Sequence, residues 1–379
     1  MDLIHNLGTS GFWLASYFVP FVFVLTVIVF FHELGHFLVA RCCGVEVTAF
    51  SVGFGPELFG YTDRRRTRWK VCAIPLGGFV KFVGDKSVVS IGDAATAENV
   101  EDRRTSFVGA SVGRRIAIVA AGPIASFLLA ITIFSGGFML FGKQVTVPRV
   151  AGVQPNTPAA AAGFQPGDIV LAVDGANVEG FDDLIRITSD SAEQVLRIAI
   201  DRNGSRLVLE AIPALREVRD VFGNVTRTRQ LGLRRSGAPA DTRIERPGPI
   251  QSIGLGVART WFIADQTLRY LFKVFAGSEG LDQLGGPVKI AQISGQAATF
   301  GFAALVQLAA ILSASVGLIN LFPIPALDGG HILFYAIEAA RGRPVSPNAQ
   351  KWGLRIGVSL VLALMLFTTV NDVLRLSAS

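Results

Sequence analysis

The sequence predicts a polytopic α-helical membrane protein with about four spanning helices and a large polar region between the second and third of them. The chain has 379 residues, of which 50% are hydrophobic and 17% are charged, and its mean hydropathy is +0.48. Ordinary soluble domains carry about 25% charged residues. A chain of this length and apolarity is expected to hold two or three domains, at least one of them in a bilayer.

Four apolar runs are long enough to cross a bilayer, which takes roughly 20 residues. They are Phe12 to Ala40, Ile116 to Phe141, Phe300 to Leu321 and Trp352 to Val370. The last run has Arg355 near its start, and a long basic side chain there can reach the interface. The first run is too long for the core of a signal peptide and has no basic segment before it, so we expect it to remain in the mature protein.

The basic residues predict the orientation of these spans, because lysine and arginine collect in cytoplasmic loops. None precedes Arg41, whereas residues 41–115 hold many of them. These are Arg41, Arg64, Arg65, Arg66, Arg68, Lys70, Lys81, Lys86, Arg103, Arg104, Arg114 and Arg115. We therefore expect loop 41–115 to be cytoplasmic and the N-terminus to be outside. The formal net charge of +6 follows from this distribution, and no nucleic-acid partner is expected.

The end of the first span contains Phe31-His32-Glu33-Leu34-Gly35-His36. In a helix His32 and His36 project from one face, where a zinc ion can lie between them. Glu33 is offset by one position and is free to hold a water and take its proton. Such a motif also arises by chance in long helices, but ionisable groups at membrane depth are costly and usually functional.

A third metal ligand is expected from the third span. His32 lies about 20 residues into a span that enters from outside, so it has descended about 30 Å towards the cytoplasmic face. The third span runs inward and ends in Asn320-Leu-Phe-Pro-Ile-Pro-Ala-Leu-Asp-Gly-Gly-His331, where two prolines break the helix. Asp328 then arrives at the depth of the histidines and is the expected ligand. His331 is the competing ligand, and Asp328 could instead cap a helix that begins at the next residue.

The loop after the first span is predicted to form two strands, Val45 to Gly55 and Trp69 to Val83, with glycines at their turns. The second strand could pair with an unwound substrate along its edge. Gly77, Gly78 and Phe79 are the expected substrate contacts on that strand. The alternative is a small hairpin with only a structural role. Ser87 to Glu101 is polar and is expected to be a mobile loop.

The region from about Gly142 to Thr299 is too polar for the bilayer. Its first part alternates short strands and turns, with a helix expected from Gly180 to Asp190 and strands at Val195 to Asp201 and Ser205 to Ile212. With its Pro166-Gly167-Asp168 turn and Val173-Asp174-Gly175 hairpin, this part resembles a bacterial PDZ domain. Such domains bind extended peptide ends by strand addition, although a purely steric role is the alternative.

The polar region continues after the PDZ-like part as a connector. From Ile250 to Ala276 apolar residues alternate with charged ones, which is typical of a helix lying at the outer membrane interface. Leu284 to Ile290 is interpreted as a loop leading to the third span. The three cysteines, Cys42, Cys43 and Cys72, have neither a disulfide pattern nor zinc-knuckle spacing and are expected to be buried thiols.

Taken together, these motifs resemble the site-2 protease family of intramembrane zinc metalloproteases, in particular its bacterial regulator-of-sigma-E protease branch. The resemblance extends across almost the whole chain. It rests on the motif ending at His36, the PDZ insertion, and four further segments, which are Ile74-Pro-Leu-Gly-Gly78, Ala121-Gly-Pro123, Gly285-Gly-Pro287 and Asn320-Leu-Phe-Pro-Ile-Pro-Ala-Leu-Asp-Gly329.

The resemblance implies one zinc ion bound by His32, His36 and Asp328, with Glu33 as the catalytic acid and base. Asn320 matches a family position that contacts substrate or the reacting carbonyl, unless it makes an interhelical hydrogen bond instead. Family members often have asparagine where this chain has Ser126, so no substrate role is assigned to that residue. Some relatives also carry two PDZ domains where one is expected here.

The resemblance further implies a multi-pass protein of the bacterial inner membrane that cleaves single-span membrane proteins. Anti-sigma factors already cut on the outer side and remnant signal peptides are the implied substrates, with the extracytoplasmic PDZ domain excluding untrimmed ones. The expected domains are 1–142 with two spans and membrane-associated strands, 143–215 as the PDZ domain, 216–299 as the connector, and 300–379 with two spans.

Two other classes of function remain open from the sequence. In a zinc-dependent membrane transporter the same four ionisable residues would form a transit site, although the sequence shows no inverted pair of broken helices. In a membrane scaffold the PDZ domain would recruit partners and the metal would be structural. A structural zinc site normally has four protein ligands, and His331 would be the fourth.

Overall fold

The computed structural model describes residues 2–84, 105–191, 194–219, 225–236, 238–277 and 285–378. The loop expected at Ser87 to Glu101 lies outside these ranges. The chain forms two compact units, one made of residues 1–136 and 250–379 and the other of residues 137–249. Each unit is described here by itself.

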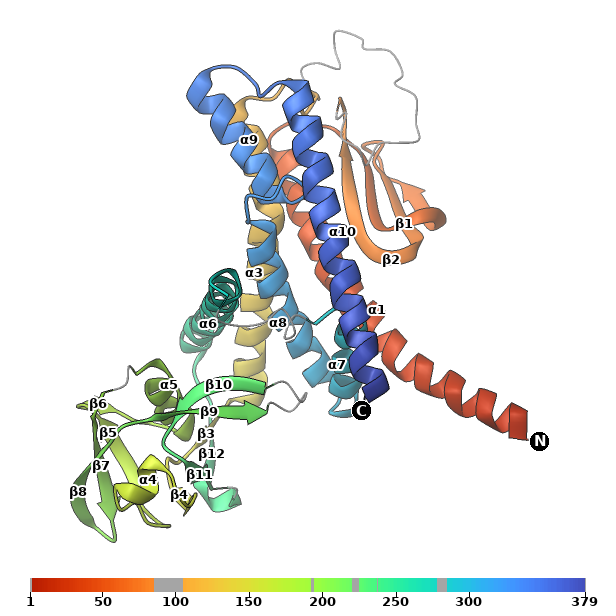
Figure 1. Cartoon of the computed structure of the whole chain (residues 1–379). Coiled ribbons are helices and arrows are strands. Elements are labelled where there is room, and N and C mark those ends of the chain that lie inside the picture. Colours follow the sequence, from red (N-terminus) through yellow and green to blue (C-terminus); the bar gives the residue numbers. More distant parts are fainter. Residues whose placement is uncertain are drawn as a thin grey trace. The chain divides into compact units, whose positions relative to one another are not determined.

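Among its described residues, the first unit contains four helices that are long and apolar enough to cross a membrane (Figure 1). They are α1 (Asp2–Cys42), α3 (Val112–Phe141), α8 (Phe302–Asn320) and α10 (Pro347–Ala378). The apolar segments inside α1 and α10 run Ser16–Cys42 and Pro347–Leu374. The prediction of four apolar helices in a multi-pass membrane protein is therefore confirmed for the part of the chain that the structure describes.

Small residues bring α1, α3 and α8 into close contact. A Cβ atom on Gly35 of α1 would lie 2.2 Å from the carbonyl oxygen of Ala121 on α3. The Ser313 hydroxyl on α8 donates to the backbone carbonyl of Ser126 on α3 over 2.9 Å. Glycine and serine allow such close approach between membrane helices, and their polar groups then bond across the interface. The result is a tight three-helix junction around the middle of α3.

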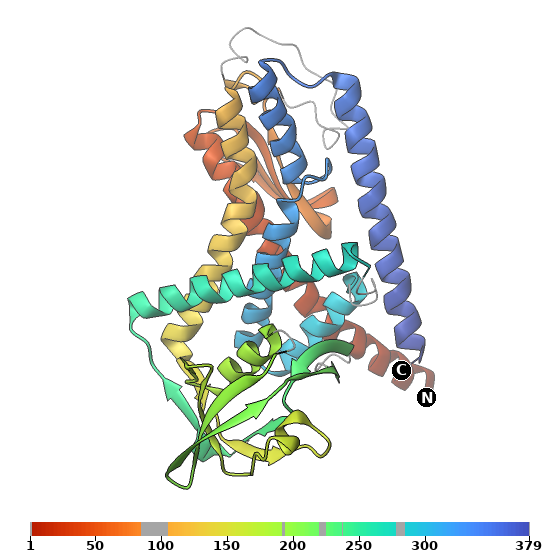
Figure 2. The ribbon, with the colours of Figure 1, turned by 60° about the vertical axis from the view of Figure 1, so that its left-hand side comes forward.

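Helix α9 (Asp328–Arg341) follows the proline-containing loop after α8 and lies beside α3 in both views (Figures 1 and 2). Arg115 at the start of α3 donates to both carboxylate oxygens of Glu338 on α9, over 2.6 and 3.1 Å. The same guanidinium lies 4.8 Å from the ring centre of Tyr335. A bidentate, mostly buried pair of this kind fixes orientation as well as distance. It therefore holds α9, and the aspartate at its start, against α3.

The strands β1 (Val47–Thr62) and β2 (Arg68–Phe82) form an antiparallel sheet in which each strand bends. Val52 in the first half of β1 pairs with both Val71 and Gly78, so this half lies between the two halves of β2. Val71 also pairs with Phe59 in the second half of β1. The bends occur where Gly53 and Gly77 have φ angles of 89° and 104°, which favour glycine.

This register corrects the expectation of a free edge along Trp69 to Val83. The first half of β2 is paired on both sides, so it has no free backbone groups to offer a peptide. Within the described residues, the unpaired edges belong to residues 78–82 of β2 and 57–62 of β1. Any strand addition is therefore restricted to these two short edges.

Two further helices precede the third span. Helix α6 (Pro249–Phe275) covers the segment for which a helix is predicted, while its place at a membrane interface stays a prediction. Helix α7 (Pro287–Thr299) begins within the segment interpreted as a loop, and that interpretation is wrong from Pro287 onward. Proline is favourable in the first turn of a helix because its missing N–H has no partner there anyway. The backbone N–H of Lys289 donates to the Asp372 carboxylate of α10 over 2.9 Å.

The second unit is built mainly of short strands around one apolar core. Its four-stranded sheet has the order β6-β5-β7-β8. The elements are β3 (Lys143–Thr146), β4 (Val150–Val153), α4 (Pro158–Ala161), β5 (Ile169–Val173), β6 (Ala176–Asn177), α5 (Phe181–Asp190), β7 (Leu196–Arg202), β8 (Ser205–Ala211), β9 (Ala214–Arg219), β10 (Val225–Gln230), β11 (Leu233–Arg235) and β12 (Thr242–Glu245). The helix and the two strands predicted between residues 180 and 212 are present.

The second unit continues past residue 215, where the sequence analysis ends the PDZ domain. Strand β11 pairs with β4, and β12 pairs with β3, so the chain returns to the start of the unit. Within the unit, Arg202 forms a bidentate pair with the fully buried carboxylate of Asp168, over 2.7 and 2.8 Å. Burial alone would raise the pKa of Asp168, but the bonds from Arg202 lower it. The predicted Pro166-Gly167-Asp168 turn is thereby tied to β7.

Candidate metal centre

Two imidazoles and one carboxylate converge in the first unit. Asp328 Oδ2 lies 3.1 Å from His32 Nε2 and 3.5 Å from His36 Nε2, and the two Nε2 atoms are 3.3 Å apart. All ligand atoms of this group lie within 4.8 Å of one another. The structure thus brings together the three residues that the sequence analysis selects as metal ligands, from the two helices α1 and α9.

Hydrogen bonds on the far sides of the rings set their orientation. His36 Nδ1 lies 2.9 Å from the carbonyl oxygen of Ile118, which can only accept, so this nitrogen carries the proton. His32 Nδ1 lies 3.1 Å from the Ser126 hydroxyl, to which it donates in the same tautomer. The Nε2 lone pairs of both rings then point into the cluster. Metal-bound histidines are commonly held in this way by a partner on the other nitrogen.

The cluster fits zinc by the chemistry of its donors. Two imidazole nitrogens and one carboxylate oxygen form a usual catalytic zinc set, which leaves a fourth position for water or substrate. Asp328 Oδ2 is buried and has no hydrogen-bond partner among the described residues. A buried carboxylate oxygen facing two lone pairs is unfavourable unless a cation lies between them. The residues present therefore suit a bound divalent metal.

Gly122 provides the space for the rings. A Cβ atom at this position would lie 2.2 Å from His36 Nε2 and 2.9 Å from His32 Nε2. These distances are far below a van der Waals contact, so only glycine allows α3 to pass this close to the two nitrogens. Gly122 belongs to the Ala121-Gly-Pro123 motif, so the glycine of this motif makes room for the two histidine rings.

Asp328 is the first residue of α9, and the residue that caps the helix is Leu327. Asp328 is therefore not the capping residue of this helix. Its carboxylate lies in the first turn, where the helix dipole favours negative charge. A Cβ on Gly330 would lie 2.3 Å from the carbonyl oxygen of Ile324, so α9 starts tightly against the proline-containing loop. His331 lies one turn further along and is not a member of the ligand cluster.

The bend of β2 lies against α1 beside Glu33. A Cβ atom on Gly78 would be 3.1 Å from Glu33 Cγ and 2.7 Å from a methyl group of Val29. Of the other expected substrate contacts, Phe79 stacks on Phe54 with ring centres 6.0 Å apart, and Gly77 approaches the same ring. The free edge that begins at Gly78 is therefore the part of the sheet next to the expected catalytic base.

Asn320 is the last residue of α8 and is half-buried. Its side chain makes no hydrogen bond to another described residue, so the structure does not use it as an interhelical link. An amide with free donors near the start of the Asp328 loop can bind a substrate group. The role of Asn320 as a substrate contact stays a prediction.

Sequence reasoning named the segment that contains Gly122 and Ser126 but gave neither residue a role beside the histidines. The family motif drew attention to the segment, but nothing local indicates that these residues face the histidines. Ser126 is fully buried and bonds His32, which is consistent with its having no expected substrate role. Besides that motif, the sequence signal is their position on a helix that carries the small residues needed for close packing.

Replacing Ser126 with Ala should lower zinc affinity about 10- to 100-fold, because His32 loses the bond that sets its tautomer. Zinc affinity is measured by competition with a chelator on the purified full-length protein. The matched control is Ser313→Ala, which removes a buried serine hydroxyl from the same helix junction without touching a histidine. Equal losses in both variants would mean that only helix packing has been disturbed.

Set among apolar helices long enough to cross a membrane, this chemistry defines a membrane-embedded metallohydrolase. Comparison with known families agrees, since the profile of peptidase family M50 matches residues 20–364. The chain belongs to peptidase family M50, the site-2 protease family, and is a zinc metalloprotease.

Bacterial relatives match over nearly the whole chain. A Rhizobium meliloti (strain 1021) protein named as a zinc metalloprotease is 47% identical over 361 residues, covering 94% of this chain and 96% of that protein. A second protein named as a zinc metalloprotease, from Agrobacterium fabrum (strain C58), is 45% identical over 369 residues, covering 97% of this chain and 98% of that protein. Metalloprotease MmpA of Caulobacter vibrioides is 36% identical over 381 residues, covering 94% of this chain and 95% of that protein.

One solved structure is similar to a small part of the chain. It is the PDZ domain of an SdrC-like protein from Listeria monocytogenes, with 17% identity over 22% of this chain and 82% of that chain. The TM-score is 0.19, which is too low to establish a shared fold.

Proposed function

We propose that this zinc metalloprotease cleaves peptide bonds within the transmembrane segments of single-span membrane proteins. The observation that carries the proposal is the position of the ligand cluster on α1, a helix whose apolar segment runs Ser16–Cys42. Ionisable groups in such a helix are costly and are retained for function. A protease with its centre there acts on segments that lie in the same apolar environment.

His32, His36 and Asp328 hold the zinc ion in this proposal, and the ion, when bound, polarises the scissile carbonyl and makes water more acidic. Glu33 holds the attacking water and takes its proton. The same carboxylic acid then returns the proton to the amine that leaves, so its charge is restored after each turnover. Asn320 donates a hydrogen bond to the carbonyl oxygen as negative charge develops on it.

A helical substrate hides its carbonyls in its own hydrogen bonds and must unwind before it is cut. Pairing with the free edge at residues 78–82 replaces part of the lost hydrogen bonding. This edge begins at Gly78, next to Glu33, so an added strand would pass the catalytic base. The other half of β2 is paired on both sides and takes no part.

We place the N-terminus and the PDZ domain outside the cytoplasm, and loop 41–115 inside, in the inner membrane of a bacterium. The support is the distribution of lysine and arginine beside the spans, together with the bacterial source of the relatives. Cleavage then occurs near the cytoplasmic surface. Anti-sigma factors already trimmed on the outer side, in regulated intramembrane proteolysis, and remnant signal peptides are the substrates that suit this arrangement.

Metal analysis of Asp328→Ala beside the parent protein tests the ligand assignment. We expect the variant to lose most of its zinc and its cleavage of a single-span substrate, because it removes one of three ligands. His331→Ala should retain its zinc, since His331 is outside the cluster. Zinc loss in His331→Ala would favour a closed structural site in a scaffold protein. Metal flux into vesicles without proteolysis would favour a transporter.

The PDZ-like unit is proposed to select substrates by the size of their extracytoplasmic part. Deleting residues 143–245, whose two ends pair with each other in the structure, should then allow cleavage of substrates with long outer domains, while cleavage of trimmed substrates continues. The measurement is the cleavage rate for a series of single-span substrates that differ only in outer length. Unchanged selectivity by length would instead indicate that the unit docks peptide ends.

A further inference from the structure

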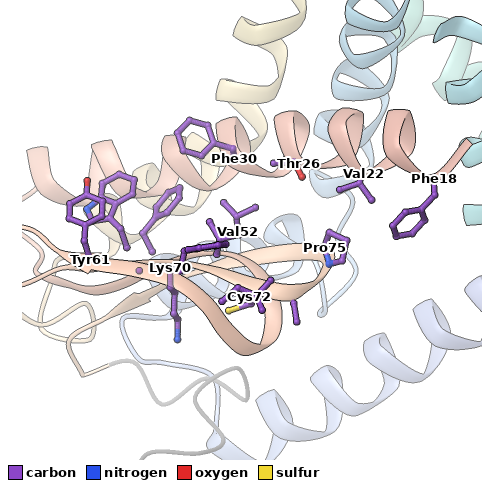
Figure 3. Close-up of a pocket in the computed structure, with 16 residues that line it drawn as sticks. Phe18, Val22, Thr26, Phe30, Val52, Tyr61, Lys70, Cys72 and Pro75 are labelled. Carbon is purple, nitrogen blue, oxygen red and sulfur yellow. The ribbon is translucent and has the colours of Figure 1, made fainter. Parts of the chain in front are cut away.

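A cavity of about 780 Å³ lies between α1 and the β1–β2 sheet, and we call it the α1–sheet cavity (Figure 3). One wall is formed by Phe18, Val22, Thr26 and Phe30, which recur every four residues on one face of α1. The opposite wall comes from both strands, with Tyr61 towards one end and Pro75 towards the other. No function described above uses this space.

The α1–sheet cavity is long and almost entirely apolar. The rise along α1 from Phe18 to Phe30 is about 18 Å. Most of the lining side chains are aliphatic or aromatic, and the Lys70 side chain points away from α1 in Figure 3. A cavity of this shape suits an extended hydrocarbon chain, and each buried methylene adds roughly 0.8 kcal/mol.

Most of the first half of β2 offers the cavity side chains rather than free backbone, whereas residues 58–61, which also line the cavity, belong to the unpaired edge of β1. The first half of β2 lines the cavity, and its backbone is paired with β1 on both sides. An unwound peptide lying along this half of β2 would leave its own N–H and C=O groups without partners, which is unfavourable in an apolar space. A fatty acyl chain has no such groups. The part of the cavity that β2 lines therefore favours an acyl chain over an extended peptide.

Three exposed arginines follow directly at one end of the cavity. Tyr61 and Trp69 stack across the end of the sheet, with ring centres 6.3 Å apart. Between them the chain turns through Asp63–Thr67, the arginine turn, which contains Arg64, Arg65 and Arg66. None of these three side chains pairs with a carboxylate among the described residues. Clustered basic residues beside a membrane span are typical of anionic lipid binding.

The arginine turn is held rigidly to the catalytic helix by Asp63. One carboxylate oxygen accepts from the backbone N–H groups of Arg65 and Thr67, each over 2.9 Å, and the other accepts from Arg41 of α1 and from Trp69. Burial alone would raise the pKa of Asp63, but these bonds lower it to about 2. The carboxylate is therefore ionised at any physiological pH, and the three arginines are presented from a fixed backbone.

We propose that the α1–sheet cavity binds an anionic phospholipid, with an acyl chain lying along α1 and the phosphate on the arginine turn. Such a lipid would contact α1 and the sheet at once, and these are the two elements that meet where Gly78 approaches Glu33. Bound lipid would thus hold the proposed substrate edge beside the catalytic helix.

The test uses the full-length protein in lipid nanodiscs with a photoreactive group at the end of the acyl chain. The probe is phosphatidylglycerol, and phosphatidylcholine with the same chains is the neutral comparison. We expect labelling within residues 16–30 of α1 from phosphatidylglycerol and much weaker labelling from phosphatidylcholine. Replacing Arg64, Arg65 and Arg66 together with Ala should weaken phosphatidylglycerol binding roughly 100-fold, at about fivefold for each arginine.

A matched variant separates the site from net charge. Arg206, Arg234 and Arg246 are exposed residues of the second unit, and replacing all three with Ala removes the same charge but should leave labelling unchanged. Val22→Trp should block the cavity and abolish labelling while zinc content is retained. The proposal is overturned if labelling is equal for the two lipids and unchanged by replacing the three arginines. It is also overturned if labelling persists in Val22→Trp. Labelling of these residues by a transmembrane peptide but not by lipid would assign the cavity to substrate.

Discussion

Replacing Glu33 with Gln should abolish proteolysis and leave zinc bound. Glutamine keeps the size of the side chain, so its packing against Gly78 is preserved. It cannot take a proton from water or return one to the leaving amine. Removing general acid–base catalysis usually costs about 10²- to 10⁴-fold in rate, and here both proton transfers are lost. The measurements are cleavage of a tagged single-span substrate and zinc per chain.

Glu46→Gln is a matched control for Glu33→Gln. Glu46 lies just after α1 and is exposed. Its replacement by glutamine makes the same change of charge and shape at a residue outside the ligand cluster. It should retain full activity and full zinc content. If Glu33→Gln still cleaves at the parent rate with zinc bound, Glu33 is not the catalytic base. Loss of zinc in that variant would instead indicate that Glu33 supports the ligands.

The spans and the ligand cluster could be predicted because their signals are local or follow from simple geometry. A run of apolar residues identifies a span without any knowledge of its neighbours. The spacing of His32 and His36 places both on one helix face. Asp328 could then be found by depth, since the third span is expected to run in the direction that brings it to the level of the histidines. The structure places its carboxylate 3.1 Å from His32 Nε2.

The free edge at residues 78–82 could not be predicted, because it depends on which half of β1 lies between the two halves of β2. Two bends, at Gly53 and Gly77, double each strand back so that one segment of each strand pairs on both sides. Glycines in the sequence indicate that a bend is possible, but not which pairs form after it. For the same reason, no local signal in the sequence shows that β11 and β12 pair with β4 and β3 at the start of the second unit.

Helix α7 was missed for a different reason. Its start, Gly285-Gly286-Pro287, looks like a loop, but proline directly after glycine is also a helix start signal. The Asp372 carboxylate from α10 bonds the backbone N–H of Lys289 in its first turn, which satisfies a group that a helix cannot pair itself. This partner is far away in the sequence. A tertiary contact thus supports a helix whose sequence alone is ambiguous.

Gly122→Ala tests the steric basis of the metal centre with a single methyl group. The added Cβ would lie 2.2 Å from His36 Nε2 and 2.5 Å from its Cε1, so the ring or the helix must move. Neither moves easily, because His36 is bonded to Ile118 on the same α3 and Gly35 packs closely on Ala121. We expect zinc affinity and proteolysis to fall roughly 100-fold or more, since a ligand itself is displaced.

Gly136→Ala is the control that makes the result specific. Gly136 lies on the same helix α3, and a Cβ there meets no atom within 4 Å. Alanine in a helix interior is favoured over glycine by about 1 kcal/mol, so this variant should keep its zinc and be slightly more stable. Zinc content and cleavage rate should therefore fall in Gly122→Ala and stay unchanged in Gly136→Ala, and the thermal stability of Gly136→Ala should rise slightly. Normal zinc affinity in Gly122→Ala would mean that α3 does not pass as close to the ligand cluster as this structure has it.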